Sequence, residues 1–164
     1  MRRLACLLGA GLLVAAPAWG ALITRHATTA TYKLTLTVGP KEAMYTADEV
    51  AMKHYTSGEV MVGNDSTSMG GMSMSAANRH LEVHVASRTT GKVVTNVRPT
   101  IALTDTSAMG GMAMSEKVNA MAMQGIGKGA ADLHYGDNVK LTAGHVYKVV
   151  VTVKGEKATF SFKA

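Results

Sequence analysis

The sequence predicts an all-β protein: an immunoglobulin-like antiparallel β-sandwich with one short helix and methionine-rich loops. Two observations predict this class. Short segments with strand character recur along the chain, and no long helical pattern separates them, which argues against a parallel α/β sheet. In addition, a Gly-x-x-Tyr sequence from Gly144 to Tyr147 leads into an apolar strand, an arrangement similar to the tyrosine corner of immunoglobulin-like domains.

The individual strands are predicted from the alternation of apolar and polar residues. Residues 31–38 (TYKLTLTV) put four apolar residues on one face and threonine and lysine on the other, as in a half-buried strand. Tight joining at Gly155 predicts a β-hairpin near the C-terminus. Capping-box spacing from Thr46 to Glu49 predicts a short helix near residues 47–55. The other predicted strands are residues 59–62, 80–86, 97–104, 117–123, 146–154 and 157–163.

The first twenty residues have the pattern of a secretory signal. A basic start at Arg2 and Arg3 precedes an apolar run at residues 4–16, and small residues follow it. We therefore expect residues 1–20 to be a signal peptide cleaved near Gly20 and Ala21. The rest of the chain, residues 21–164, is then expected to be a single secreted immunoglobulin-like domain.

The composition of the chain after residue 20 narrows its chemistry. Cys6, the only cysteine, lies within the predicted signal, so a disulfide, a thiolate metal site and a cysteine nucleophile are not expected, and any soft metal ligand has to be methionine. Without Arg2 and Arg3 the chain keeps 15 of its 17 basic residues against 11 acidic ones. These basic residues are scattered, with no stripe and no interleaved aromatics, so we do not expect nucleic-acid binding.

Two nearly identical methionine-rich segments stand out. Residues 69–75 read MGGMSMS and residues 109–115 read MGGMAMS. Thioether sulfur is a soft, neutral donor that suits Cu(I) far better than zinc, calcium or magnesium, and the glycines leave the backbone free to wrap an ion. The alternative is a flexible linker whose methionines pack on the surface or absorb oxidants. The candidate metal ligands are Met69, Met72, Met74, Met109, Met112 and Met114.

A second candidate site lies in the predicted strand at residues 80–86. Alternation sends His80, Glu82 and His84 to one face of this strand and three aliphatic residues to the other. Next-nearest side chains on a strand are about 6.6 Å apart, so two of the three can converge on one ion without bending the strand. The alternative is an ordinary solvated face, and His84 is the member most expected to be a plain surface residue.

A third candidate combines Met121 and Met123 with the segment HYGDN at residues 134–138, which taken alone is interpreted as a polar turn. The run HYGDNVKLTAGHVYKVVVTV resembles a segment of the periplasmic iron-transport protein family, small copper-binding immunoglobulin-like proteins that accompany a membrane iron permease. That family carries Met-x-Met shortly before its HYG histidine and His-x-Glu on an earlier strand. In this chain Met121 and Met123 match the first motif, and His80 and Glu82 match the second.

The resemblance implies a copper site formed by His80, Met123 and His134, with Met121 alongside. Glu82 would lie beside this site and could help to hold a second metal such as iron. The chain departs from the family pattern in two ways. Met123 and His134 are more widely separated, and the family's additional histidine after the last long strand has no counterpart. Other small periplasmic copper proteins, including YtkA-like domains, combine a similar sandwich with methionine-rich loops, so a relationship to that wider group stays open.

These observations predict a periplasmic protein that holds copper through histidine, methionine and glutamate ligands, with iron as a further candidate metal. Its expected role is copper handling or copper-linked iron uptake, by binding and transfer and not by catalysis. The implied partners are the metal ion and a membrane metal permease or periplasmic metal acceptor, with a homodimer also allowed. The alternative is a structural or adhesive secreted immunoglobulin-like domain with oxidation-absorbing methionine loops. A copper or iron oxidase ranks third.

Overall fold

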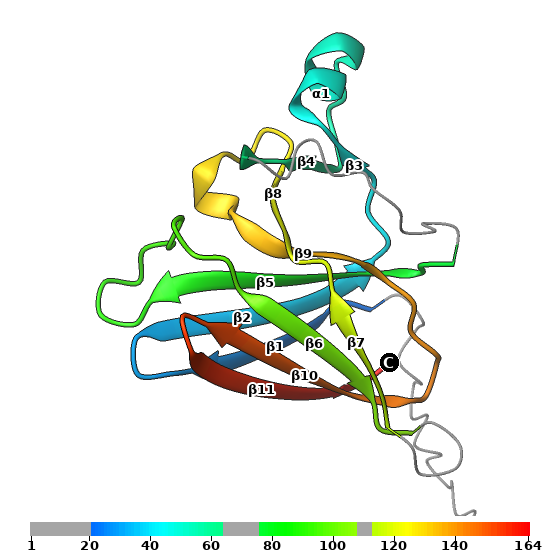
Figure 1. Ribbon diagram of the computed structural model, residues 1–164. Helices are drawn as coiled ribbons and strands as arrows, with labels where there is room; N and C mark the ends of the chain where they lie inside the picture. The colour runs from blue at the N-terminus through cyan, green and yellow to red at the C-terminus, as the bar shows by residue number, and fades with distance from the viewer. Residues whose placement is uncertain (1–20, 64–75, 108–112) are drawn as a thin grey trace, which may run out of the picture.

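The computed structural model describes residues 21–63, 76–107 and 113–164, which form an all-β sandwich of two sheets (Figure 1). The larger sheet has the strand order β1-β2-β5-β9-β8-β4-β3, and the smaller has the order β11-β10-β6-β7. The predicted all-β sandwich is therefore confirmed. The strands are β1 (Ile23–Thr28), β2 (Tyr32–Pro40), β3 (Met44–Tyr45), β4 (Glu59–Met61), β5 (Arg79–Ser87), β6 (Thr100–Asp105), β7 (Met114–Val118), β8 (Met121–Gly125), β9 (His134–Val139), β10 (Val146–Val153) and β11 (Glu156–Lys163).

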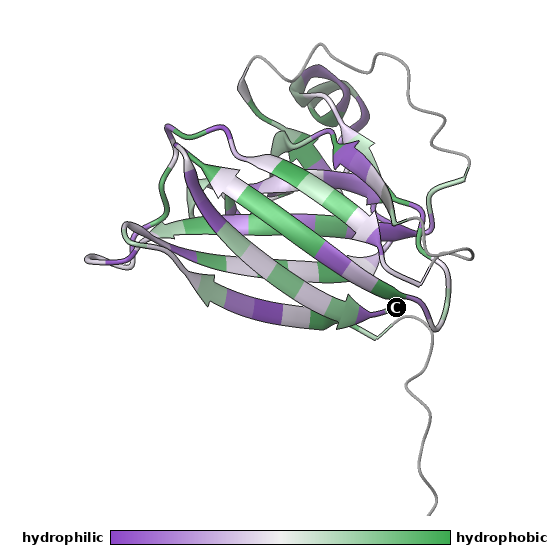
Figure 2. Ribbon diagram, turned by 60° about the horizontal axis from the view of Figure 1, so that its bottom comes forward, coloured by the Kyte–Doolittle hydropathy of each residue, from purple (hydrophilic) through white to green (hydrophobic). Residues whose placement is uncertain are grey.

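The hydrophobic core lies between the two sheets and follows from the alternation of residues along the strands. On β2, Leu34, Leu36 and Val38 are almost completely buried, and from the smaller sheet Val149 and Val151 of β10 join the same cluster. Figure 2 shows this alternation as bands of hydrophobic and hydrophilic residues along the strands. Burying each of these side chains contributes about 1.5–3 kcal/mol, which makes this the main source of stability.

Three local predictions are confirmed. The helix α1 (Ala47–Lys53) has the expected capping box, in which the Thr46 hydroxyl accepts from the Glu49 amide and the Glu49 carboxylate accepts from the Thr46 amide. The β10–β11 hairpin turns at Lys154 and Gly155, both with positive φ. The Tyr147 hydroxyl accepts a hydrogen bond of 2.8 Å from the backbone N–H of Thr142, as a tyrosine corner requires.

The strand predicted at residues 117–123 is wrong as a single element. Its first part belongs to β7 in the smaller sheet, where Val118 pairs with Ile101, and its second part is β8 in the larger sheet, where Met123 pairs with His134. The chain crosses between the sheets over Asn119 and Ala120. Each part of the segment has apolar residues that are buried in its own sheet. These residues follow closely along the chain, so the segment resembles one strand.

The interpretation of residues 134–138 as a polar turn is also wrong, because they form most of the fully buried strand β9. Buried polar groups are tolerated when they are hydrogen-bonded, and those of β9 largely are. The Asn138 side chain, for example, accepts from the backbone N–H of Glu42 and donates to the Glu42 carbonyl. The structure also adds β1, which was not predicted because its residues are mostly exposed.

The larger sheet extends beyond the part that the smaller sheet covers. Figure 1 shows β8, β4 and β3, together with α1, on the side of β9 that lies away from β10 and β11. Residues on the face of the larger sheet that points away from the core, such as His80 and Met123, are nevertheless buried. No helix within the described residues is long and apolar enough to cross a membrane.

Candidate metal centre

Strand β5 places its polar residues on the face of the larger sheet that is turned away from the core. Leu81, Val83 and Val85 enter the hydrophobic core, so alternation sends His80, Glu82 and His84 to the opposite face. The predicted orientation of this segment is therefore correct. His80 is nevertheless only 3% exposed, so this is not an ordinary solvated face.

Strand β9 adds its own polar residues to the same face. It pairs with β5 in antiparallel register, with His80 opposite Asn138 and Glu82 opposite Gly136. Residues that are directly paired point to the same side of a sheet, and His134 lies two residues before Gly136. The segment that contains His-x-Glu and the segment that contains HYG are thus joined by strand pairing.

Strands β8 and β4 complete the face with methionine and one more carboxylate. Met123 pairs with His134, Met61 pairs with Met123, and Glu59 pairs with Gly125 next to them. Buried methionines form a small cluster separate from the main core, consisting of Met44, Met61, Met121 and Met123. Strand pairing therefore brings Met123 beside His134 and Met121 beside Gly136, and two methionines that were not predicted there, Met44 and Met61, pack with them.

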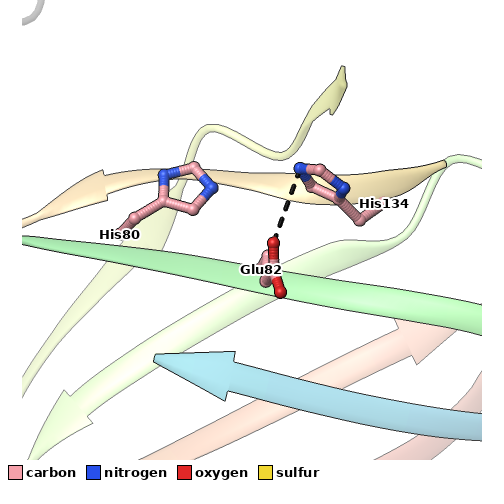
Figure 3. Close-up of side chains that lie close together, drawn as sticks. All are labelled: His80, Glu82 and His134. Atoms are coloured by element: carbon pink, nitrogen blue, oxygen red, sulfur yellow. Dashed lines mark ion pairs between the residues drawn. The ribbon is translucent and has the colours of Figure 1, made fainter. Parts of the chain in front are cut away.

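The side chains of His80, Glu82 and His134 converge on one another (Figure 3). One ligand atom from each lies within 4.8 Å of the others. Nε2 of His134 is 3.6 Å from Oε2 of Glu82 and 3.3 Å from Oε2 of Glu59. Two ligands on one tetrahedral ion, each about 2.1 Å from it, lie about 3.4 Å apart. These separations are therefore of the size that a shared metal ion requires.

Hydrogen bonds orient both histidines in the same way. Nδ1 of His134 lies 2.8 Å from the carbonyl oxygen of Asp132, so this nitrogen must carry the proton and donate. Nδ1 of His80 lies 3.2 Å from Oδ1 of Asn138, an oxygen that also accepts from the Glu42 amide. Both rings therefore present Nε2 to the space between them. Fixing the ring through the other nitrogen is the usual way in which proteins prepare a histidine for metal binding.

Among the described residues, three atoms on this face are buried without a hydrogen-bond partner: Nε2 of His80, Nε2 of His134 and Oε2 of Glu59. The His134 and Glu59 atoms are close enough for an ion pair but are not aligned as a hydrogen bond. Leaving a buried polar group unpaired costs about 1–3 kcal/mol. A cation held by His80, Glu82 and His134, whose ligand atoms lie within 4.8 Å of one another, would satisfy both histidine nitrogens, so these residues fit a bound metal.

The charges around His134 favour a cation at this point. Burial lowers the pKa of His134, but the neighbouring Glu59 and Glu82 outweigh that effect and the pKa rises overall. Burial raises the pKa of Glu82, but His84, His134 and His80 outweigh it and bring the value to about 2. Burial lowers the pKa of His80, which keeps its ring neutral and its Nε2 lone pair available.

Gly136 allows the two histidine-bearing strands to approach each other. A Cβ atom at this position would clash with the carbonyl oxygen of Leu81 and lie 2.9 Å from the Cα of Glu82. Both are backbone atoms of β5 and cannot move aside without separating the strands. The glycine within HYG therefore has a packing role directly at the site.

Of the methionines in the two repeated segments, the structure describes only the backbone of Met114. Met69, Met72, Met74, Met109 and Met112 lie outside the described residues. The backbone of Met114 begins β7 in the smaller sheet, where it pairs with Asp105, so its strand is not one of those that carry the histidines.

Two residues at the site were missed by the sequence analysis, Glu59 and Asn138. Glu59 and Met61 are two residues apart on β4 and therefore point to the same face, but nothing in the sequence links that face to His80. Asn138 lies in the HYGDN segment that was interpreted as a turn. Both were missed for the same reason, because their positions depend on which strands pair.

Comparisons with known proteins were made in sequence and in structure. No protein-family model and no curated protein matches the sequence. Two solved structures match the fold. One is FetP of uropathogenic E. coli, in its as-isolated form after expression in the periplasm of E. coli, with a TM-score of 0.55 and 15% identity over 88% of this chain and 96% of FetP.

The other solved structure is a copper-bound variant of the same E. coli protein, with a TM-score of 0.51 and 14% identity over 87% of this chain and 97% of that chain. At this level of identity the likeness concerns the fold. The resemblance noted in the sequence is confirmed to that extent: the chain folds like FetP, whose variant binds copper.

Proposed function

We propose that this protein binds copper in the periplasm and acts in copper handling or copper-linked iron uptake, by binding and transferring the ion. The observation that carries the proposal is the convergence of His80, Glu82 and His134, whose ligand atoms lie within 4.8 Å of one another, with Nε2 of both histidines buried and unpaired among the described residues. The likeness to a fold that holds copper in FetP supports copper as that cation. The N-terminal signal pattern supports the location.

Each ligand type has a distinct role in this proposal. The imidazoles of His80 and His134 bind Cu(II), and the thioether of Met123, with Met121 nearby, favours Cu(I). Glu82 and Glu59 supply negative charge that balances the ion in a buried environment. A site with both ligand types accepts either oxidation state, which suits transfer to or from a partner.

The narrower role in iron uptake rests on the two carboxylates. Glu59 and Glu82 provide oxygen ligands of the kind that iron accepts, and both lie close to His134. The proposed partners, a membrane metal permease or a periplasmic metal acceptor, follow from a transfer role.

Metal titration of the purified protein tests the proposed function. Cu(II), Cu(I), Zn(II) and Fe(II) are each titrated in competition with a chelator of known affinity. We expect one tight site for copper in both oxidation states and weaker binding of Zn(II) and Fe(II), in line with the general order of metal affinities. If the wild-type protein binds copper no more tightly than a variant that lacks His80 and His134, the proposal fails.

Replacing Met123 with leucine is expected to lower Cu(I) affinity about tenfold or more, while Cu(II) affinity changes little, because the thioether is the soft ligand of the set. Leucine nearly conserves the volume of this fully buried side chain, so stability should fall by less than about 1.5 kcal/mol. Competition titration and thermal melting measure the two effects. Met52→Leu, at a methionine exposed on α1, is the control and should change neither.

The two methionine-rich segments have a separate test. Changing Met69, Met72, Met74, Met109, Met112 and Met114 together to leucine should leave the melting temperature nearly unchanged. If the segments capture metal, Cu(I) affinity or the rate of copper exchange falls. If they absorb oxidants, as in the structural or adhesive alternative, copper binding stays intact and tolerance to peroxide is lost.

A further inference from the structure

Glu82 lies between two histidines, and its two carboxylate oxygens face different ones. Oε2 is 3.6 Å from Nε2 of His134, and Oε1 is 3.5 Å from Nε2 of His84. The ring centroids of His84 and His134 are 5.2 Å apart, whereas those of His80 and His134 are 6.1 Å apart. The structure therefore places His84 in the cluster, although the sequence predicted a plain surface residue.

Exposure to solvent decreases stepwise along this row of side chains. The exposed fraction is 29% for His84, 20% for Glu82 and 1% for His134. A hydrated ion can therefore meet His84 and Glu82 while it still carries water, whereas contact with Nε2 of His134 requires that the water be lost. His84 and Glu82 thus form the solvent-facing end of the cluster.

Asp132 is the other partly exposed acidic group near His84 and His134. Its carboxylate already accepts a hydrogen bond of 2.9 Å from the Gly125 amide and lies 3.8 Å from Nζ of Lys128. The carboxylate of Glu82, by contrast, contacts only the histidines of the cluster in the ion pairs of the described residues. Glu82 is therefore the better candidate for a shared ligand.

We propose that His84 and Glu82 form an outer metal position, which receives a hydrated Cu(II) ion and passes it to the buried site through Glu82. This inference rests on the proposed copper-binding function. Nε2 of His84 and Oε1 of Glu82 are 3.5 Å apart, close enough for one ion with bonds of about 2 Å to contact both. Imidazole and carboxylate suit Cu(II), the oxidation state that needs no thioether.

The transfer is an exchange of ligands. Glu82 stays bound to the ion while Nε2 of His134 replaces Nε2 of His84, and water leaves as the ion moves inward. No electron is transferred, and the charge of the ion is unchanged. The same path in reverse releases the ion to a partner at the exposed side of His84.

The experiment compares rates with affinities in a His84→Ala variant of the full protein. Stopped-flow mixing with Cu(II) measures capture, and mixing of the loaded protein with excess chelator measures release. We expect both rates to fall about tenfold, the scale on which neighbours of metal ligands act, with an unchanged equilibrium affinity. A residue that the ion only passes changes the activation barrier for capture and release, but not the free energy of the bound state.

His26→Ala is the matched control. His26 is an exposed histidine on the same face, two strands away, because it pairs with Thr35, which in turn pairs with His84. Its removal should leave both rates at the wild-type value. A His84→Gln variant, which keeps a polar side chain beside Glu82 but lacks an imidazole, should be as slow as His84→Ala.

Three results would overturn the inference in different ways. Wild-type rates in both His84 variants would show that the ion does not pass this residue, while the copper-binding function would stand. Lower affinity with faster release would make His84 a ligand of the final site. Failure of the wild-type protein itself to bind Cu(II) would remove the proposed function together with the inference.

Discussion

Replacing His80 and His134 together with alanine is expected to weaken Cu(II) binding at least about 100-fold, while Cu(I) binding falls far less. The two Nε2 atoms are the nitrogen ligands that the oxidised ion needs, and both are buried and unpaired. The reduced ion keeps the thioether of Met123. Competition titrations with copper in each oxidation state measure the effect. The result is the ratio of the loss in Cu(II) affinity to the loss in Cu(I) affinity.

The controls for this double variant address surface binding and folding. His26 and His54 are exposed histidines outside the cluster, and replacing both with alanine should leave either affinity unchanged. Because alanine at His134 leaves Glu59 and Glu82 without the imidazole that faces them, a His80→Gln, His134→Gln variant checks that lost affinity does not simply reflect unfolding. An equal loss for Cu(I) and Cu(II) in folded protein would contradict the separate roles of imidazole and thioether.

Replacing Gly136 with alanine is expected to destabilise the protein by about 3 kcal/mol, the upper part of the range for overpacked sites. The added Cβ would collide with the backbone of Leu81 and Glu82 in the neighbouring strand. Since β5 and β9 carry the two histidines, their separation would also disrupt the cluster. Thermal melting should show a drop of roughly 10 °C, and Cu(II) affinity should fall in the protein that remains folded.

Gly39→Ala is the matched control for that experiment. Gly39 also lies in a strand of the larger sheet, opposite His80. A Cβ there would meet only a side-chain carbon of Leu22, at 3.4 Å, which is ordinary contact. This variant should melt close to the wild-type temperature. If the two variants had the same melting temperature, the close approach of the strands at Gly136 would not be needed for stability.

Local features of this protein were predictable because they depend on neighbouring residues in the chain. The helix after Thr46 follows from a capping box within a single turn. The orientation of His80, Glu82 and His84 follows from the alternation of a strand, which is a property of the backbone alone. The pairing of HYG with His-x-Glu was implied by a resemblance, which carries information about tertiary structure that the residues themselves do not.

Other features depended on pairing between distant strands. The segment at residues 117–123 was divided between two sheets because Val118 and Met123 serve different layers. The HYGDN segment has the composition of a turn, and it became a buried strand because partners such as Glu42 satisfy its polar groups.

The sequence by itself determined the all-β class, the alternation on β5 and the ligand types available: histidine, carboxylate and thioether, without thiolate. Tertiary structure decided that Glu59 would face His134 and that His84 would join the cluster beside Glu82. The physical reason is that strand alternation sets only the side to which a residue points. Which other strands share that side, and whether they exclude water from it, depends on a sheet order that is set by burial across the whole molecule.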